Sequence, residues 1–357
     1  MRVVHVDSAS GWRGGQNQVL LTAQGMAARG HEVVLACQRG GVLEGRARSA
    51  GLDVRPLSFR GDLWPGAAWG LARLLRAFPS DAAQLHDPHA LSAGVLAQSL
   101  GARTRLVATR RVDFRVKGAL SRAKYRRAAR VIAVSGAIAD LLRADGLAAD
   151  VVRVVYEGVP DRAPQPGGRD VLRDLGLPPD ALVVGNVAAL TDHKDHETLL
   201  AAAASVVTRV PAAHFVIVGE GELRAPLEAR ARALGLQDRC VFAGFRTDLD
   251  QLIPAFDVFC LSSHMEGLGT SLLDAMAFGR AVVATRAGGI PEAVADGLTG
   301  RVVAARDAAG LASALTHVLL DERARTAFGI AGRRRFLERF TSDLMVERTL
   351  AVLQEVA

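Results

Sequence analysis

The stretch VFCLSSHMEGLGTSLLDAMAFG, residues 258–279, joins an apolar run, a glycine-rich turn and the start of a helix. The apolar run predicts a buried strand, and the turn leads to a helix N-terminus, whose backbone N–H groups and partial positive charge favour a phosphate. Gly267 and Gly269 would let the backbone approach a ligand closely. Glu266 and Asp274 carry carboxylates that accept hydrogen bonds from vicinal hydroxyls, as a sugar or ribose offers. The stretch therefore predicts a strand–turn–helix unit that binds a ligand.

The same alternation of strand and helix extends along most of the chain. Candidate strands are residues 2–6, 31–36, 105–109, 130–135 and 151–158 in the first half, and 181–188, 214–221, 240–245, 258–263 and 281–289 in the second. Helices are predicted over residues 16–29, 67–77, 137–145, 197–208 and 223–234. Strands that alternate with helices in this way predict parallel sheets covered on both faces.

The length of the chain indicates more than one domain. A sequence of 357 residues is too long for one average core. Residues 158–170, GVPDRAPQPGGRD, contain three prolines and three glycines and predict an interdomain linker. We therefore expect an α/β protein with two doubly wound domains, residues 1–165 and 166–340, that face each other across a ligand-binding cleft. The helix expected in residues 341–357 would pack back across the linker.

Composition restricts the functional classes. No apolar run reaches the roughly 18 to 20 residues that span a bilayer, and the first residues predict a strand rather than a secretory signal. Cys37, Cys240 and Cys260 form no CxxC pair, which favours a reducing, cytoplasmic location without a cysteine-based zinc site. The net charge of +7 and the pI near 10.1 favour anionic partners. Nucleic acid is not expected, because aromatic residues are only 5% and no binding motif is present.

Two further segments of the second half carry chemistry. Lys194, in GNVAALTDHKDHETLLAA (185–202), is predicted between a strand and a helix, where its ammonium can reach a diphosphate. The segment RAGGIPEAVADGLTGRVV (286–303) places two glycines and Glu292 after a strand. Ser271 and Asp274 also fit a capping box, so the residues alone leave open whether Asp274 binds a ligand or only its own helix start.

Together these segments resemble the family 4 glycosyltransferases, a group of retaining, metal-independent enzymes with the GT-B fold of two Rossmann-like domains. In that family an E-x7-E motif binds the donor, and EGLGTSLLDAMAFG (266–279) is similar to it. The other matching segments are GGIPE (288–292), VIAVS (131–135), VYEGVP (155–160), GWRGGQNQVLL (11–21) and RGHEVV (29–34). The matches lie in the family's order, and the resemblance covers essentially the whole chain.

The resemblance implies a role for each matching residue. Glu266 would hold the hydroxyls of the donor sugar, Lys194 would neutralise the diphosphate, and Asp274 would bind the nucleotide ribose. His86, in LHDPHAL, would lie near the anomeric carbon and orient the sugar, so the catalytic set would be His86, Glu266 and Lys194. The remaining donor-binding positions are the loop glycines Gly14 and Gly15, the base-binding turn at Phe245 and Arg246, and the backbone of Gly267, Leu268, Gly269 and Thr270.

Two positions depart from the family pattern. The second acid of the motif is Asp274 rather than glutamate, which shortens its reach by one carbon–carbon bond, about 1.5 Å. Many relatives have an arginine five positions before the lysine, where this chain has Ala189. Neutralisation of the donor phosphates would then fall on Lys194, the helix dipole and any other basic residue nearby.

The resemblance also implies a reaction. A sugar would pass, with retention of configuration, from a nucleotide-diphosphate donor, UDP-linked by family habit, to an envelope-glycan, lipid-linked or small-molecule acceptor. Retention in the family is usually explained by attack on the same face, with the leaving phosphate accepting the proton of the acceptor. Preorganised positive groups should lower the barrier most, because departure of the diphosphate creates negative charge. No metal or other cofactor is expected.

Two segments offer candidate metal ligands. The Asp-x-Asp of TDLDQL (247–252) is a metal-binding signature of a different transferase fold, although Thr247 and Asp250 also fit a capping box. In DHKDH the candidate ligands are His193, Asp195 and His196, with exposed loop residues as the alternative interpretation.

Other functions compete with sugar transfer. A dehydrogenase is disfavoured, because GWRGGQ is not G-x-G-x-x-G and the next strand is followed by Gln38 and Arg39 rather than by an acid. A nucleotide-sugar epimerase on the same fold stays open, and so does a non-catalytic nucleotide-sugar-binding homologue. A measurement of donor transfer or hydrolysis with the purified protein separates the transferase, the epimerase and the non-catalytic homologue.

A basic stretch lies in the first domain. Residues 110–130, RRVDFRVKGALSRAKYRRAAR, form either a solvated face or a surface that docks on anionic lipid, where each basic residue contributes about 1 kcal/mol. Docking would suit a lipid-linked or envelope-glycan acceptor and a peripheral position on the inner face of the cytoplasmic membrane. The basic residues concerned are Arg110, Arg111, Arg115, Lys117, Arg122, Lys124, Arg126, Arg127 and Arg130.

Overall fold

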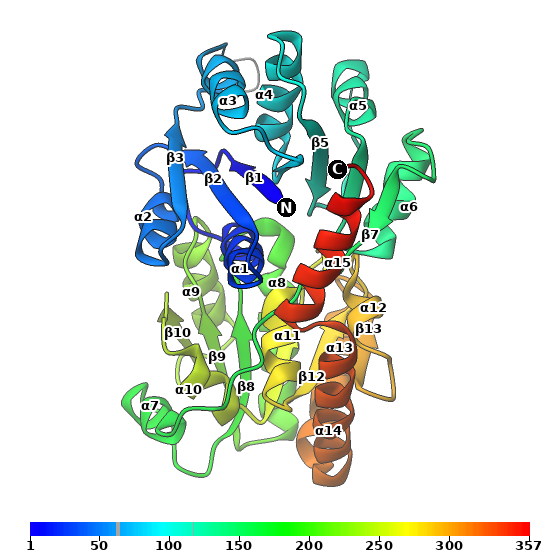
Figure 1. The fold of residues 1–357 in the computed structure, drawn as a ribbon. Coiled ribbons are helices and arrows are strands. Elements are labelled where there is room, and N and C mark those ends of the chain that lie inside the picture. The colour runs from blue at the N-terminus through cyan, green and yellow to red at the C-terminus, as the bar shows by residue number, and fades with distance from the viewer. Residues whose placement is uncertain (62–64, 117) are drawn as a thin grey trace. The chain divides into compact units, whose positions relative to one another are not determined.

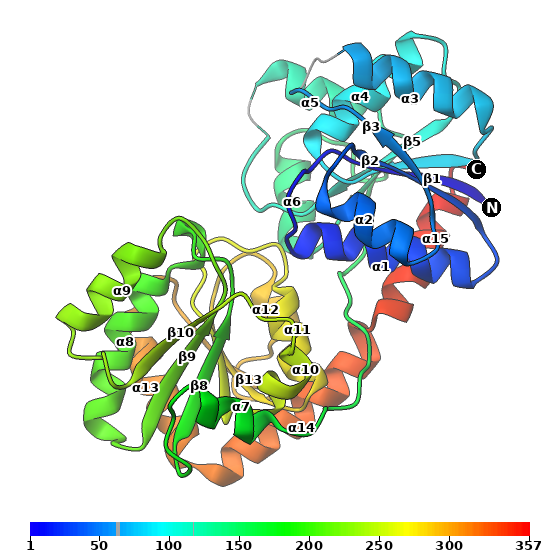
Figure 2. The same cartoon turned by 90° about the vertical axis from the view of Figure 1, so that its left-hand side faces the viewer.

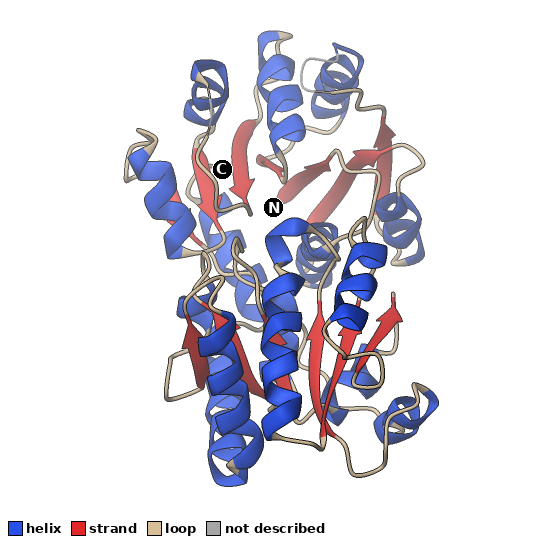
Figure 3. Ribbon diagram, turned by 180° about the vertical axis from the view of Figure 1, so that it is seen from behind, coloured by secondary structure: helices blue, strands red, loops and turns tan. Residues whose placement is uncertain are grey.

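The structure, a computed structural model, describes residues 1–61, 65–116 and 118–357 (Figure 1). It consists of two compact units. The first unit contains Met1–Gly158 and Ser342–Ala357, and the second unit contains Val159–Thr341. Each unit is a parallel β-sheet between layers of helices, which Figure 3 shows in red and blue. The predicted α/β class with two doubly wound units is confirmed.

The sheet of the first unit has the strand order β3-β2-β1-β4-β5-β6-β7, and neighbouring strands pair in parallel. The chain begins in the middle of the sheet, winds outward to β3, and then crosses to β4 on the other side of β1. This reversal is typical of nucleotide-binding folds. The strands are β1 (Arg2–Asp7), β2 (Glu32–Gln38), β3 (Asp53–Leu57), β4 (Ala82–Leu85), β5 (Arg105–Arg110), β6 (Arg130–Ala133) and β7 (Val152–Val154).

Helices cover both faces of this sheet. One face packs on α3 (Pro65–Ala77), α4 (Pro88–Ser99), α5 (Ala119–Arg126) and α6 (Gly136–Ala144). The other packs on α1 (Gly14–Ala28), α2 (Val42–Ser49) and α15 (Ser342–Gln354). Helix α15 lies against α1, where a Cβ on Gly25 would come within 2.5 Å of Val346 (Figure 1). The C-terminal helix therefore belongs to the core of the first unit.

The second unit repeats the same topology. Its strand order is β10-β9-β8-β11-β12-β13, again paired in parallel, and the reversal falls between β8 and β11. The strands are β8 (Leu182–Val187), β9 (Ala213–Val218), β10 (Cys240–Gly244), β11 (Val258–Leu261), β12 (Ala281–Thr285) and β13 (Gly300–Val303). Most of their residues are buried, and most of the buried ones are apolar, as expected for strands covered on both faces.

The helices of the second unit lie on the two faces of its sheet (Figure 2). One face packs on α8 (His196–Arg209), α9 (Arg224–Ala233) and α13 (Ala308–Leu320). The opposite side carries α7 (Gly168–Asp174), α10 (Leu249–Leu252), α11 (Thr270–Ala277) and α14 (Glu322–Arg339). Short turns complete the unit: η1 (Asp192–Lys194), η2 (Ile253–Ala255) and α12 (Ile290–Ala293).

Two further observations bear on the composition-based expectations. Among the helices that the structure describes, none combines the length and the apolar character that crossing a bilayer requires. Cys37, Cys240 and Cys260 are buried and unpaired, and burial raises the pKa of each thiol to about 12. They are therefore packing residues rather than reactive thiols.

Candidate active site

Ligands of open α/β sheets bind outside the carboxyl ends of the strands, where the strand order reverses. In the first unit this point lies between β1 and β4, and in the second between β8 and β11. The residues that the sequence singles out follow these strands. His86 comes directly after β4, Lys194 follows β8, and Glu266 follows β11.

The second unit brings Lys194 and Glu266 together. The Lys194 ammonium donates to Oε2 of Glu266, and the Ser263 hydroxyl donates to the same oxygen at 3.1 Å. The Ser262 hydroxyl holds the backbone of Lys194 by donating to its carbonyl oxygen at 2.9 Å. Both charged side chains are largely buried, with exposed fractions of 18% and 12%. The two loops at the strand reversal thus present one paired cation and carboxylate.

The turn after Glu266 leads directly into α11. Gly269 adopts a left-handed conformation, with φ of +88°, as the residue that precedes the helix. The first helical hydrogen bond runs from Leu272 N to Gly269 O, so the N–H groups of Thr270 and Ser271 precede the helical ladder. Leu268 is fully buried and anchors the turn. The carbonyl of Gly267 accepts from Gly289 N at 3.2 Å, which ties the turn to the GGIPE segment.

Asp274 faces the linker segment of its own unit. Its Oδ1 accepts from Arg162 Nη2 at 2.8 Å, and Nη1 of the same arginine pairs with Asp250 at 2.9 Å. Burial raises the pKa of Asp274 to about 6, against the opposing charge of Arg162. The capping-box interpretation of Ser271 and Asp274 is wrong, because α11 starts after Gly269 and no side chain caps it.

The Asp-x-Asp segment and the FAGFR turn lie beside each other in sequence and share contacts. Arg246 Nε donates to Asp248 Oδ1 at 2.9 Å, and Arg162 pairs with Asp250. Each carboxylate of the Asp-x-Asp segment therefore has an arginine partner. Phe245, directly after β10, is 62% exposed, which leaves a ring face open to a planar ligand.

The other candidate metal ligands have local structural roles. Asp195 caps α8 by accepting from Thr198 N at 3.2 Å. His196 is buried, and its Nε2 lies 3.1 Å from the side-chain oxygen of Asn186. His193 contacts the hydroxyl of the neighbouring threonine at 3.2 Å. Each of the three side chains therefore has a hydrogen-bond partner within its own unit.

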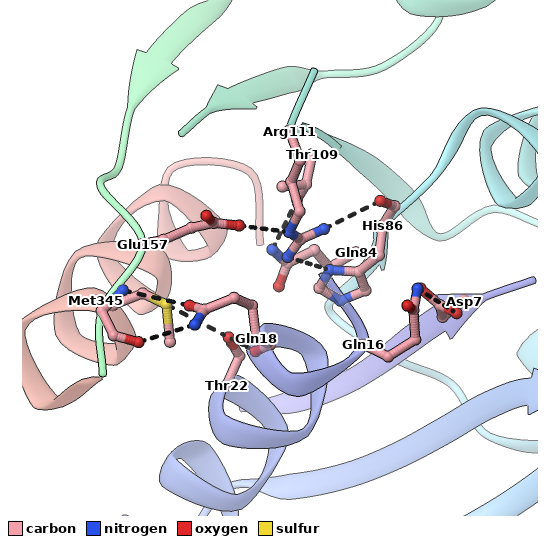
Figure 4. Close-up of polar contacts among 11 residues, drawn as sticks. Asp7, Gln16, Gln18, Thr22, Gln84, His86, Thr109, Arg111, Glu157 and Met345 are labelled. Atoms are coloured by element: carbon pink, nitrogen blue, oxygen red, sulfur yellow. Dashed lines mark hydrogen bonds and ion pairs between the residues drawn. The ribbon is translucent and has the colours of Figure 1, made fainter. Parts of the chain in front are cut away.

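In the first unit, a buried polar cluster lies at the carboxyl ends of β1, β4 and β5 (Figure 4). His86 is 4% exposed, and its Nε2 lies 2.9 Å from Nδ1 of His5. Arg111 Nη2 lies 3.1 Å from Nδ1 of His86 and its Nε donates to Glu157 at 2.9 Å. Helix α1 begins at Gly14, and a Cβ on Gly15 would lie 3.7 Å from Arg111. The predicted Gly15 and His86 are therefore linked through Arg111.

Two acids extend this cluster. Asp7, the last residue of β1, accepts from Ala9 N at 3.0 Å and from the Gln16 side chain. Burial raises the pKa of Asp7 to about 6, and the nearby Asp87 carboxylate adds to the rise. Asp87 caps α4 and binds the Ser8 backbone at 2.7 Å. The cluster is thus held by hydrogen bonds among β1, α1 and α4.

Sequence reasoning missed several members of this cluster. His5 and Asp7 alternate with valines in RVVHVD, and a polar residue on the buried face of a strand was the available signal. Arg111 was assigned to a surface, and Glu157 was assigned no role. Arg111 and Glu157 are 46 positions apart, so no local sequence pattern indicates that they pair.

Two family models match most of the chain. The model described as Glycosyltransferase Family 4 matches residues 12–162, and the one described as Glycosyl transferases group 1 matches residues 169–335. Together they span both units, including His86, Lys194 and Glu266. The chain therefore belongs to the family 4 glycosyltransferases.

Individual relatives agree with this placement. The lipopolysaccharide core biosynthesis glycosyltransferase LpsE of Rhizobium meliloti is 33% identical over 179 residues, which are 50% of this chain and 52% of LpsE. The alpha-maltose-1-phosphate synthase of Mycobacterium tuberculosis is 34% identical over 248 residues, 63% of each chain. The chain thus spans between about half and two-thirds of the length of these curated relatives.

Solved structures share the fold. Anabaena HepE in complex with UDP and glucose superposes with a TM-score of 0.88 at 22% identity, covering 99% of this chain and 100% of HepE. WaaG, a glycosyltransferase involved in lipopolysaccharide biosynthesis, gives a TM-score of 0.75 at 19% identity, with 99% of each chain covered. These likenesses confirm the GT-B fold.

Proposed function

We propose that the protein transfers a sugar from a nucleotide-diphosphate sugar to an acceptor, with retention of configuration. The observation that carries this function is the Lys194–Glu266 pair, which lies at the strand reversal of the second unit and directly before the start of α11. A cation, a carboxylate and a helix N-terminus together match the diphosphate and the hydroxyls of such a donor. The complex of HepE with UDP and glucose supports a UDP-linked sugar.

Each group at this site has a distinct chemical task. The Glu266 carboxylate accepts hydrogen bonds from sugar hydroxyls, and its contact with Ser263 fixes its orientation. The ammonium of Lys194 and the start of α11 stabilise the negative charge that forms as the diphosphate leaves. Because these groups are already oriented before the donor binds, they lower the barrier without reorganisation. The exposed ring of Phe245 stacks on the base.

The two departures from the family pattern act on opposite ends of the nucleotide. Asp274 uses one oxygen for Arg162, so we place the ribose contact at its other carboxylate oxygen. Ala189 supplies no charge to the phosphates, which leaves Lys194 as the cation at this turn. We therefore expect substitution of Lys194 to have a large effect.

Retention is proposed to follow from attack on the same face as the leaving group. Glu266 is paired with Lys194 and Asp274 with Arg162, so both motif carboxylates have cationic partners. A carboxylate stabilised in this way is a poor nucleophile, which favours proton transfer from the acceptor to the departing phosphate. The anomeric configuration of the product, read by NMR, tests this point, and an inverted product contradicts it.

The first test combines donor binding with turnover. A panel of UDP- and GDP-sugars is screened for thermal stabilisation, because a donor present at about 100 times its Kd stabilises the folded protein by about 2.7 kcal/mol. The best donor then enters an assay of nucleotide release, with product analysis that separates transfer, hydrolysis and epimerisation. Stabilisation by a donor without any turnover supports a non-catalytic binding protein instead.

Substitution of Lys194 tests the site. We expect Lys194→Ala to lower kcat/KM by about a hundredfold or more, because one preorganised charge-stabilising group is lost. Arg209→Ala, at an exposed position of the following helix, is the matched control and should keep normal activity. Normal kcat/KM in Lys194→Ala removes that residue from the site.

The predicted basic surface is smaller in the structure than in the sequence. Arg110 is buried and donates to the Tyr125 hydroxyl at 3.2 Å, and Arg111 pairs with Glu157, so neither faces solvent as predicted. Arg115 pairs with Asp145 at 2.8 Å but its side chain is 65% exposed, so it stays on the surface. Lys117 lies outside the described residues. The remaining predicted members are the exposed Arg126 and Arg127, the half-buried Arg122 and Lys124, and Arg130, which pairs with Glu355.

We propose that the outer side of residues 112–116 and 118–127, here termed the α5 surface, docks on anionic lipid. Exposed apolar side chains accompany the arginines there: Leu120 is 86% exposed and Phe114 is 52% exposed. Apolar groups that enter the lipid interface and arginines that meet head groups are the combination that binds anionic bilayers. Such docking supports an acceptor that is lipid-linked or part of an envelope glycan, and LpsE is a relative named for lipopolysaccharide core synthesis.

Vesicle flotation tests the α5 surface. We expect the protein to float with vesicles that contain anionic lipid and not with neutral ones. Leu120→Ser combined with Arg126→Ser should abolish flotation. Leu298→Ser, at a leucine of the second unit that is 70% exposed, is the matched control. Binding that is indifferent to lipid charge rules the proposal out.

A further inference from the structure

Two histidines on neighbouring strands of the first unit form one buried pair. Nδ1 of His5 lies 2.9 Å from Nε2 of His86, and the two rings are 24° from parallel with centroids 5.2 Å apart. Their exposed fractions are 0% and 4%. Two imidazoles this close share a single proton in their hydrogen bond, so one ring donates and the other accepts.

Arg111 determines the direction of this hydrogen bond. A guanidinium can only donate, and Nη2 of Arg111 lies 3.1 Å from Nδ1 of His86. Nδ1 of His86 must therefore accept, which places the ring proton on Nε2, where it is donated to His5. A second bond, from Nη1 to the His86 carbonyl at 3.0 Å, holds the guanidinium and the ring at a fixed distance.

Glu157 keeps the arginine in place. The Nε of Arg111 donates to Glu157 at 2.9 Å, and the side chains of the pair are 16% and 9% exposed. A buried guanidinium is costly unless it is paired, so Glu157 makes the position of Arg111 stable. Gly15, near the start of α1, also lies close to Arg111, because a Cβ at this position would be 3.7 Å from the arginine side chain.

The electrostatics of the cluster agree with neutral rings. Burial and the charge of Arg111 lower the pKa of His5 to about 3 and hold the pKa of His86 well below its usual value. The acids of the cluster, Asp7 and Asp87, hydrogen-bond to α1 and to the loop after β1 rather than to either ring. Nδ1 of His5 accepts from His86, so the single proton of the His5 ring lies on Nε2, which has no hydrogen-bond partner among the described residues.

We propose that Arg111 is a positioning residue that fixes His86 as the neutral tautomer with its proton on Nε2. Both nitrogens of His86 are then occupied, so this ring neither removes nor supplies a proton during turnover. It contributes a rigid, uncharged surface to the cluster at the carboxyl ends of β1, β4 and β5. The relevance to turnover rests on the proposed function, whereas the tautomer itself does not.

The tautomer is measured by NMR on the full-length protein labelled with ¹⁵N-histidine. Long-range ¹H–¹⁵N spectra distinguish a ring with its proton on Nε2 from the other tautomer and from the charged form. His86→Gln and His5→Gln assign the signals. We expect both rings to show the Nε2–H pattern, without titration, from pH 6 to 8.

Substitution of Arg111 then tests its role. Arg111→Met should leave His86 as a mixture of tautomers with a raised pKa, and Arg111→Lys, which keeps one charged donor, should restore the single tautomer. The matched control is Arg105→Met, at an exposed position of β5, the strand that ends directly before Arg111, and it should leave the spectrum unchanged. In the transfer assay Arg111→Met should lower kcat by about tenfold to a hundredfold with little change in the KM of the donor.

Several results would overturn this inference. One is a wild-type His86 that carries its proton on Nδ1 or is charged at pH 7. Another is an Arg111→Met spectrum identical to that of the wild type. If Arg111→Met does not fold, the Arg111→Lys spectrum and the wild-type tautomer decide the question. A wild-type protein that transfers no sugar refutes the proposed function. The role of Arg111 in fixing the His86 tautomer is then decided by the NMR spectra alone.

Discussion

At the scale of single residues, buried charge governs the behaviour of the cluster around β1. Asp7 is 1% exposed, and its carboxylate relies on the Ala9 N–H and the Gln16 amide for stabilisation. Because burial raises its pKa to about 6, the folded protein binds this proton more tightly than the unfolded chain does. The resulting stabilisation is complete below about pH 4 and is lost as the pH rises through about 6.

A comparison with Asp7→Asn isolates this effect. The amide imitates the protonated acid and can still accept from the Ala9 N–H, but it does not ionise. We expect the free energy of unfolding of Asp7→Asn, relative to the wild type, to increase by about 1.4 kcal/mol between pH 5 and pH 8. Urea unfolding at the two pH values measures it. An equal difference at both values would show that Asp7 is ionised throughout.

The sequence predicted some residue pairs and not others. Lys194 and Glu266 were placed together because the family motif and the strand ends both point to one sheet edge, and their ion pair confirms that they meet. The contact between Arg162 and Asp274 spans 112 positions and depends on how the linker packs. Charge and spacing alone give no reason to choose Arg162 from among the other arginines of the chain.

At the scale of elements, close contacts between the sheet and its surroundings determine which residues fit. Gly185 lies in β8 beneath the fully buried ring of Phe256, and a Cβ at this position would come within 2.0 Å of that ring. Phe256 directly precedes Asp257, which accepts from Val183 N at 2.8 Å. Phe256 N also donates to Ile253 O at 3.1 Å, so the backbone that carries the ring is held by hydrogen bonds.

We therefore expect Gly185→Ala to destabilise the protein by about 1–3 kcal/mol or more, since overpacking forces the ring or the strand to shift. Gly45→Ala is the control: its Cβ would meet no atom within 4 Å, and alanine favours the helix in which it lies. Thermal unfolding of both variants measures the effect. A Gly185→Ala protein as stable as the wild type would mean that the ring can move aside.

Strands with strong apolar character were predicted, and weak ones were missed. All ten candidate strands coincide with observed strands, whereas β3, β4 and β13 were not identified. β3 and β13 lie at the sheet edges, where Pro56, Asp53 and Arg301 are tolerated because one side of the strand is unpaired. β4, AAQL, is short and poor in β-branched residues, and only its place between β1 and β5 makes it a strand.

At the scale of the whole molecule, the first unit is assembled from two distant parts of the chain. Met345, Val346 and Leu353 of α15 pack with Val3 and Met26 in one buried cluster. The Gln18 side-chain amide donates to the carbonyl oxygen of Gly158 at 3.0 Å and accepts from the N–H of Gly158 at 3.3 Å. Composition marked the proline-rich segment as irregular but did not indicate where it packs. In the structure Asp161 pairs with Arg333 and Arg162 pairs with Asp250, so the segment packs on the rest of the second unit.

This arrangement makes a prediction for fragments. Residues 1–158 alone should be unstable, because the apolar face that α15 covers is exposed. Joining residues 342–357 to that fragment through a flexible linker should restore a cooperative thermal transition. A matched fusion with Val346→Asp and Leu353→Asp should not. A stable 1–158 fragment with a sharp transition would show that α15 is dispensable to the core.

The split first unit has a consequence for synthesis of the chain. Residues 342–357 leave the ribosome only after all of Val159–Thr341 has been translated. At about 5–20 residues per second, this is a delay on the order of ten seconds or more. Over that interval the nascent first unit presents the uncovered cluster around Val3 and Met26 to its surroundings. Protection of this surface during translation, rather than the intrinsic folding rate of either sheet, is then expected to limit the yield of native protein.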